Sequence, residues 1–239
     1  SQTADVDLAL RDLVRSAFGH AGQKCSAASL AIVEAPLYDD PAFRARLADV
    51  VRSLRVGPAT DLATQMGPLI APPSGRLARA LSSLDPGEEW LVEPRPLGDP
   101  RLWSPGVRIG VRPGSWFHHT ECFGPVLGVI RADDIDHATD IQNAVAYGLT
   151  GGLHSLDDDE IERWLARVEV GNAYVNRHTT GAIVRRQPFG GWKRSSVGRG
   201  AKTGGPGDVA RFVRFRRTSP TDVDQATASY RHWWATRFG

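Results

Sequence analysis

Gly22-Gln-Lys-Cys-Ser26, followed closely by Ser29-Leu-Ala-Ile-Val-Glu34, carries most of the information in this chain. The second stretch is a short apolar run with β-branched residues, which predicts a buried strand. The first stretch places the thiol of Cys25 in a loop of small residues. Small neighbours let a substrate carbon reach the sulfur, and a thiol of pKa about 8.5 becomes a strong nucleophile once its thiolate is favoured. Because such thiols are also common as small buried hydrophobes, this motif alone leaves both interpretations open.

Helical and extended patterns alternate along the rest of the chain. Apolar residues recur at helical spacing over residues 6–18, and Asp39-Asp-Pro41 is typical of a helix start. No element is assigned to residues 86–117, which are dense in Pro, Gly and Trp. Further helices are expected over 75–84, 133–147, from Asp157 onward and over 226–238, and strands over 126–131, 151–155, 171–176 and 211–217. This alternation predicts an α/β fold with a mostly parallel sheet.

Composition excludes several classes of protein. With 239 residues the chain is long enough for one large domain, and its hydrophobic content of 41% and charged content of 23% are ordinary for a globular protein. A formal net charge of +2 gives no general attraction to nucleic acid or to an anionic membrane. No apolar run approaches the ~20 residues of a membrane helix, and the N-terminus lacks the pattern of a signal peptide. Together with the thiol motif, these features favour a reduced, cytoplasmic protein.

Three motifs carry a resemblance to a known family. They are Gly22-Gln-Lys-Cys25, Glu121-Cys-Phe-Gly-Pro125 and Pro188-Phe-Gly-Gly191, the last within a glycine-rich segment over 181–207. Their order and approximate spacing resemble those of the aldehyde dehydrogenase superfamily. The resemblance covers roughly residues 6–217, nearly the whole chain.

Other segments resemble one branch of that superfamily. Cys25-Ser26, Asn176-Arg-His-Thr-Thr-Gly-Ala182 and Gln187-Pro-Phe-Gly-Gly191 are similar to L-glutamate γ-semialdehyde dehydrogenase, also called Δ1-pyrroline-5-carboxylate dehydrogenase. Trp103-Ser-Pro-Gly106, residues 187–196 and the aromatic C-terminal tail resemble the C-terminal part of bacterial bifunctional proline-utilisation proteins. The resemblance therefore implies an oxidoreductase of proline catabolism whose substrate is an aldehyde with a carboxylate, and a possible proline dehydrogenase module upstream.

The resemblance implies roles for three residues around the reacting aldehyde carbon. Cys25 attacks this carbon to form a thiohemiacetal, hydride leaves for the nicotinamide of NAD, and water hydrolyses the thioester. The backbone N–H of Cys25 supplies one oxyanion donor. Glu121 accepts hydrogen bonds from the nicotinamide ribose hydroxyls, which suits a carboxylate, and Phe123 lies against that ribose.

Four further residues are implied to bind the substrate. Ser26, Gly181 and Ala182 form the set that anchors its α-carboxylate, since a hydroxyl and two backbone N–H groups in a glycine turn make a small anion site. Phe189 forms a wall against the aliphatic part of the substrate. The plainer alternatives are a tight turn in which Ser26 bonds to backbone and a Phe189 that belongs to the core.

The chain also lacks parts that the family uses. No nucleotide-binding G-x-G-x-x-G segment precedes Cys25, and neither the general-base glutamate nor the oxyanion asparagine is found. The resemblance thus implies a three-layer α/β/α catalytic domain without the N-terminal Rossmann cofactor domain, so that NAD is bound mainly by an upstream domain. We expect a thiol-bearing domain over 1–207, and an oligomerisation strand (211–217) and aromatic tail within 208–239. We expect no NAD-dependent turnover from the chain alone.

Rival functions stay open at this point. A cysteine hydrolase with His178 and Asn176 as partners is disfavoured because Ser26 stands where a papain-like site has tryptophan. An aldehyde dehydrogenase of other specificity and a non-catalytic assembly module are further alternatives. The arginines of the 211–217 segment suit a guarded edge strand better than an RNA contact. No histidine pair has the spacing of a zinc helix, so no metal site is predicted.

Overall fold

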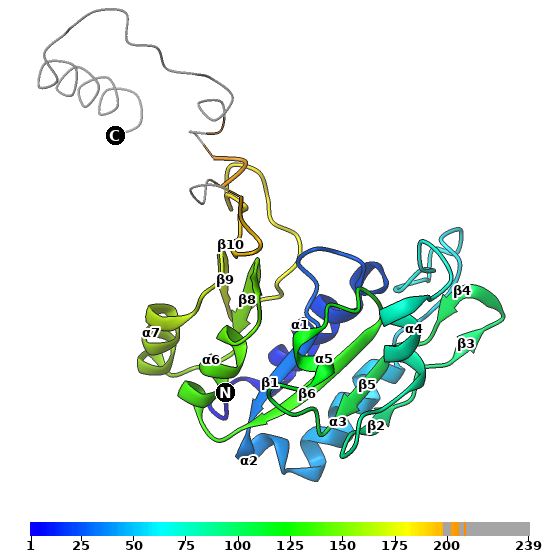
Figure 1. The fold of residues 1–239 in the computed structure, drawn as a ribbon, viewed down its shortest axis with the longest axis horizontal. Helices are drawn as coiled ribbons and strands as arrows, with labels where there is room; N and C mark the ends of the chain where they lie inside the picture. Colours follow the sequence, from blue (N-terminus) through cyan, green and yellow to red (C-terminus); the bar gives the residue numbers. More distant parts are fainter. Residues whose placement is uncertain (198–201, 206–207, 209–239) are drawn as a thin grey trace, which may run out of the picture. The chain divides into compact units, whose positions relative to one another are not determined.

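The computed structural model describes residues 1–197, 202–205 and 208 (Figure 1). The chain divides into two compact units, residues 1–205 and residues 206–239. All elements with defined bounds in the described residues belong to the first unit. The expected strand over 211–217 and the expected helix over 226–238 lie outside the described residues, and so does the proposed oligomerisation strand.

The first unit alternates helices and strands (Figure 1). The helices are α1 (Val6–Phe18), the 3-10 helix η1 (Gly19–Gly22), α2 (Ala35–Tyr38), α3 (Pro41–Arg52), α4 (Gly75–Ser82), α5 (Trp116–His119), α6 (Ile135–Asn143) and α7 (Asp158–Arg167). The strands are β1 (Leu30–Glu34), β2 (Glu89–Val92), β3 (Pro96–Leu97), β4 (Asp99–Trp103), β5 (Gly106–Ile109), β6 (Val126–Ala132), β7 (Tyr147–Gly148), β8 (Thr150–Leu153), β9 (Asn172–Val175) and β10 (Trp192–Lys193).

An acidic residue caps the start of each of α1, α3 and α7, and the sequence predicted the last two of these caps. The side chain of Asp5 accepts a hydrogen bond from the N–H of Leu8 at the start of α1. Asp40 caps α3, which has proline in its first turn, and Asp157 accepts from two N–H groups of α7. Each cap satisfies amide donors that the helix itself leaves without an acceptor.

A four-stranded sheet in the order β1-β6-β5-β2 forms the centre of the fold. Its β1–β6 and β5–β6 pairs are parallel, whereas β2 runs antiparallel to β5. A second parallel pair, β8–β9, lies beside α6 and α7 in Figure 1. Helix α1 packs on α3 and β6, and α6 packs on β1 and β6. The prediction of an α/β fold with a mostly parallel sheet is therefore confirmed, with the parallel strands divided between two sheets.

Two details of the sequence-based expectation were wrong. The stretch over 86–117, to which no element was assigned, contains β2, β3, β4, β5 and the start of α5. The helix expected over 133–147 ends at Asn143. The carbonyls of Asn143, its last residue, and of Val145 accept from the ammonium group of Lys193, and Tyr147 then pairs with Lys193 in the antiparallel β7–β10 contact. This long-range pairing competes successfully with local helix propensity.

The main core lies between α1, α3 and the central sheet. Leu10 and Phe18 of α1, Leu47 of α3 and the β6 residues Leu127 and Ile130 are all at most 2% exposed. A smaller cluster surrounds Trp164 of α7. Across the described residues, none of the helices combines the length and apolar character that a bilayer-spanning helix needs.

A buried ion pair lies on the β2–β5 side of the central sheet. The guanidinium of Arg108 donates to the Glu88 carboxylate at 2.8 Å, and the two side chains are 1% and 2% exposed. The same guanidinium donates to the carbonyls of Ser83 and Ala80 at the end of α4. It also lies over the Phe117 ring, 4.3 Å from the centroid. One charged group thus joins α4, β5 and α5, and it forms an ion pair with Glu88.

We expect Glu88→Leu to lower the free energy of unfolding by about 3–5 kcal/mol, because it leaves a buried guanidinium without its carboxylate. The double variant Glu88→Leu/Arg108→Met should recover most of that loss. Asp99→Asn, which weakens the exposed Arg101–Asp99 pair, is the control and should change the free energy by less than about 1 kcal/mol. Urea unfolding of the three variants measures these values. A double variant as unstable as Glu88→Leu would contradict the account.

Candidate functional site

A strained turn connects α1 to the loop that bears Cys25. His20, Ala21 and Gly22 have φ values of 55°, 53° and 68°, so three successive residues are left-handed. The N–H of Gln23 then bonds to the His20 carbonyl at 3.0 Å. Two of these residues carry a Cβ and adopt this region at an energetic cost, which the surrounding contacts must offset. The turn reverses the chain and presents Cys25 to solvent.

The thiol loop touches the loop that carries Glu121 and Phe123. A Cβ built on Gly22 would lie 2.2 Å from the carbonyl oxygen of Gly124. Only glycine permits this approach of the two backbones, and its positive φ demands glycine as well. The Gln23 side chain also reaches the Phe123 carbonyl, to which it donates at 3.3 Å. The structure therefore brings the first two predicted motifs together.

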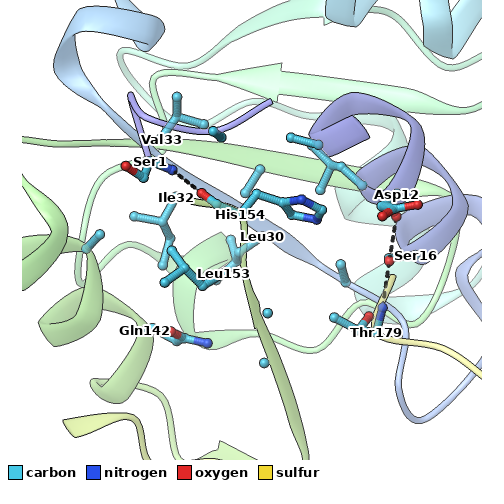
Figure 2. Close-up of a pocket in the computed structure, with 18 of the residues that line it drawn as sticks. Ser1, Asp12, Ser16, Leu30, Ile32, Val33, Gln142, Leu153, His154 and Thr179 are labelled. Carbon is cyan, nitrogen blue, oxygen red and sulfur yellow. Dashed lines mark hydrogen bonds between the residues drawn. The ribbon is translucent and has the colours of Figure 1, made fainter. Parts of the chain in front are cut away.

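On its other side the thiol loop is held by the carbonyl of Ser26. This carbonyl accepts from the hydroxyl of Thr179 at 2.9 Å and from the hydroxyl of Thr150 at 3.4 Å. The N–H of Thr179 bonds in turn to Ser16 of α1, whose hydroxyl donates to the Asp12 carbonyl (Figure 2). Ser26 itself is 6% exposed, whereas its neighbour Cys25 is exposed.

The three remaining predicted residues follow these threonines in the chain. Gly181 is exposed and left-handed at φ 81°, and Ala182 is half-buried. Phe189 is half-buried and fixed by two backbone hydrogen bonds with Thr203, each 2.8 Å. Thr179 thus brings the start of the segment 179–182 to Ser26. Phe189 is fixed separately, by its backbone hydrogen bonds with Thr203.

Glu121 and Phe123 line an open groove of about 440 Å³. Its other lining residues are Ser74, Arg76, Leu77 and Cys122. Both Glu121 and Phe123 are exposed, so a carboxylate and an aromatic ring are available to a ligand. This pairing fits a sugar diol beside an aromatic surface, because the carboxylate accepts two hydroxyl hydrogen bonds. The residues present fit the nicotinamide ribose of NAD.

The two cysteines have opposite environments. Cys122 is buried, its thiol lies 3.7 Å from the Thr120 carbonyl, and burial raises its pKa to about 11. A thiol with this pKa stays protonated at neutral pH and is a poor nucleophile. Cys25 is exposed in a loop of small residues and is the better candidate for chemistry.

A cavity of about 290 Å³ lies between β1 and β8 (Figure 2). Residues of α1, β1, α6 and β8 line it, and Leu30, Ile32 and Leu153 give it an apolar wall. Its lining includes Ala27, Ala28 and Ser29 but not Cys25. The lining also includes the charged residues Asp12, Glu34 and Arg177, and His154, whose Nδ1 is buried without a hydrogen-bond partner in the described structure.

Sequence reasoning missed several residues of this arrangement. Gln23, Thr150 and Ser16 had no assigned role, and Thr179 was noted only as part of a motif. The polar pair Thr179-Thr180 inside a motif and the amide of Gln23 beside the thiol were available signals. Ser16 lies within a helical pattern and offers no such signal.

Comparison with known proteins identifies the class of this fold and site. The family model described as "Aldehyde dehydrogenase family" matches residues 1–216. The chain therefore belongs to the aldehyde dehydrogenase family.

Two relatives within the family are named 1-pyrroline-5-carboxylate dehydrogenase, and a third is a proline utilization protein. A 1-pyrroline-5-carboxylate dehydrogenase of Bacillus cereus (strain ATCC 10987 / NRS 248) is 36% identical over an alignment of 232 positions, and the match covers 91% of this chain and 42% of that protein. Proline utilization A (PutA) from Corynebacterium freiburgense has a TM-score of 0.84 at 53% identity, over 95% of this chain and 24% of that one. The NAD-bound 1-pyrroline-5-carboxylate dehydrogenase from Thermus has a TM-score of 0.79 at 36% identity, over 89% and 41%. The chain thus spans less than half the length of these relatives.

Iodoacetamide should label Cys25 and leave Cys122 unmodified at neutral pH. A pKa of about 11 lowers the thiolate fraction of Cys122 roughly 300-fold relative to an ordinary thiol of pKa about 8.5, and burial slows its reaction further. Mass spectrometry of the digested protein measures both rates. Cys25→Ser is the control and should abolish labelling until guanidinium unfolds the chain. Equal labelling of both thiols in the folded protein would show that the assigned environments are incorrect.

Proposed function

We propose that this chain provides the thiol-bearing part of an NAD-dependent L-glutamate γ-semialdehyde dehydrogenase. The observation that carries the proposal is the exposed Cys25, whose loop is bound on one side to the Glu121–Phe123 loop and on the other to Thr179. The similarity to 1-pyrroline-5-carboxylate dehydrogenases supports the substrate class. The similarity to PutA supports a parent protein that also has a proline dehydrogenase module.

In the proposed reaction the Cys25 thiolate attacks the aldehyde carbon, and the carbonyl oxygen becomes an oxyanion. The backbone N–H of Cys25 lies in a turn closed by the 3.0 Å bond from the Ala27 N–H to the Lys24 carbonyl, and it donates to that oxyanion. NAD, when bound, accepts the hydride that leaves the thiohemiacetal carbon. Water then attacks the thioester, which releases the carboxylate product and regenerates the thiol.

The other residues orient the reactants. The Glu121 carboxylate accepts from the ribose hydroxyls of the cofactor, and Phe123 packs on the same ribose. Ser26 and the N–H groups of Gly181 and Ala182 bind the substrate's α-carboxylate, and Phe189 bounds its aliphatic chain. The left-handed φ of 81° at Gly181 supports this role, because a left-handed residue can direct neighbouring N–H groups toward one anion.

A chimera tests the activity directly. This chain replaces the matching segment of the Bacillus cereus 1-pyrroline-5-carboxylate dehydrogenase, which supplies the remaining length. We expect NADH formation from NAD and glutamate γ-semialdehyde, followed by absorbance, and no NADH from the chain alone. Cys25→Ser should lower kcat by roughly 10⁴-fold or more, because a covalent step is lost. Cys122→Ser is the matched control and should retain activity. A Cys25→Ser chimera with unchanged turnover would refute the proposal.

Substrate preference tests the anchoring residues. In the active chimera, Ser26→Ala should lower kcat/KM for glutamate γ-semialdehyde roughly 10- to 100-fold, the worth of one hydrogen bond to a charged group. The same change should alter kcat/KM for propanal, which has no carboxylate, much less. Ser29→Ala, at an exposed serine of the same loop, is the control. Equal losses with both aldehydes would instead indicate an aldehyde dehydrogenase of other specificity.

A further inference from the structure

The side chain of Gln23 connects three loops. Its Nε2 donates to the Phe123 carbonyl at 3.3 Å, and its Oε1 accepts from the Ile70 N–H at 2.9 Å. These partners lie 100 and 47 positions away in sequence, and Gln23 stands two residues before Cys25. Gln23, which is half-buried, therefore joins three loops. They are the thiol loop, the loop that carries Glu121 and Phe123 (the groove loop), and the loop that contains Ile70.

Phe123 is the partner whose conformation most needs support. Its φ is 57°, a left-handed value that a residue with a large side chain adopts only when its surroundings fix it. Gln23 donates to its carbonyl, and the neighbouring Gly124 contacts Gly22. Phe123 lines the groove and is 39% exposed. Its backbone is thus positioned by contacts from Gln23 and Gly22 of the thiol loop.

The Ile70 bond holds Gln23 from the opposite side. Leu69 is 2% exposed and its N–H bonds to the Arg101 carbonyl at 2.8 Å, so this part of the loop is anchored in the core. The Ile70 N–H extends that anchor to the Gln23 oxygen. With its oxygen fixed in this way, the Gln23 amide presents its nitrogen to Phe123.

We propose that Gln23 is a positioning residue that sets the placement of Phe123 and the groove loop relative to the Cys25 thiol. A neutral amide is suited to this place because it donates and accepts at the same time. An ionised glutamate of the same shape still accepts from Ile70, but it turns a carboxylate oxygen toward the Phe123 carbonyl. A leucine does neither. The catalytic meaning of the placement rests on the proposed function, in which Phe123 contacts the cofactor and Cys25 the substrate.

Amide hydrogen exchange on the full chain tests the placement without any turnover. In Gln23→Glu, exchange across residues 121–126 should rise about tenfold while Ile70 stays protected; in Gln23→Leu, both should exchange faster. Gln65→Leu is the matched control, since the Gln65 oxygen accepts from the Arg55 N–H at 2.9 Å in a neighbouring loop. It should leave residues 121–126 unchanged, and urea midpoints verify that all variants fold. Unchanged exchange across 121–126 in both Gln23 variants overturns the proposal.

Kinetics of the chimera test the catalytic consequence. Gln23→Glu should lower kcat roughly 10- to 100-fold, because hydride transfer depends on the alignment of the reacting groups, while KM for the aldehyde changes less than about threefold. A rise in the aldehyde KM with an unchanged kcat would overturn the positioning role. If the unsubstituted chimera forms no NADH, the proposed function fails, and the exchange measurement alone decides whether Gln23 positions Phe123.

Discussion

The close approach of Gly22 to Gly124 is the constraint on which the site depends. A single methyl group at Gly22 would lie 2.2 Å from the Gly124 carbonyl oxygen, far inside van der Waals contact. The two loops that carry Cys25 and Phe123 therefore meet at backbone level, with no side chain between them. Because backbone positions vary less than side-chain positions, this contact gives the thiol and the groove a defined separation.

Sequence patterns predicted the parts of the fold whose causes are local. The caps at Asp40 and Asp157, the apolar spacing of α1 and the apolar run of β1 contain their own signals, and the structure has these elements at the expected places. The strands between residues 86 and 117 were missed because they are short and lie in a stretch dense in Pro and Gly. β3 and β4 pair with each other, but β2 pairs with β5, and β5 pairs with β6, which begins after Pro125. Pairing of this kind is a tertiary effect that local propensity does not record.

The distinction between local signals and long-range contacts applies to the site as well. The motif around Cys25 predicted a reactive thiol. In agreement with that hypothesis, Cys25 is exposed, whereas Cys122 is buried. The hydrogen bond from Thr179 to the Ser26 carbonyl joins residues 153 positions apart and involves a backbone acceptor that every residue type possesses. No residue pattern at Ser26 marks it as an acceptor. The roles of Glu121 and the anchoring residues stay predictions, because the geometry gives the positions of these residues and does not show which ligand they bind.

The thiol loop also links the central sheet to the β8–β9 sheet. It ends where β1 begins, in the central sheet, and its Ser26 carbonyl accepts from Thr150 of β8 and from Thr179, which follows β9. The Ala28 N–H adds a 3.1 Å bond to the Ser16 carbonyl of α1. A shift of β8 and β9 relative to β1 must therefore stretch or break the bonds at Ser26, one residue from the sulfur. The two threonine bonds therefore couple the position of Cys25 to β8 and β9, across the cavity that lies between β1 and β8.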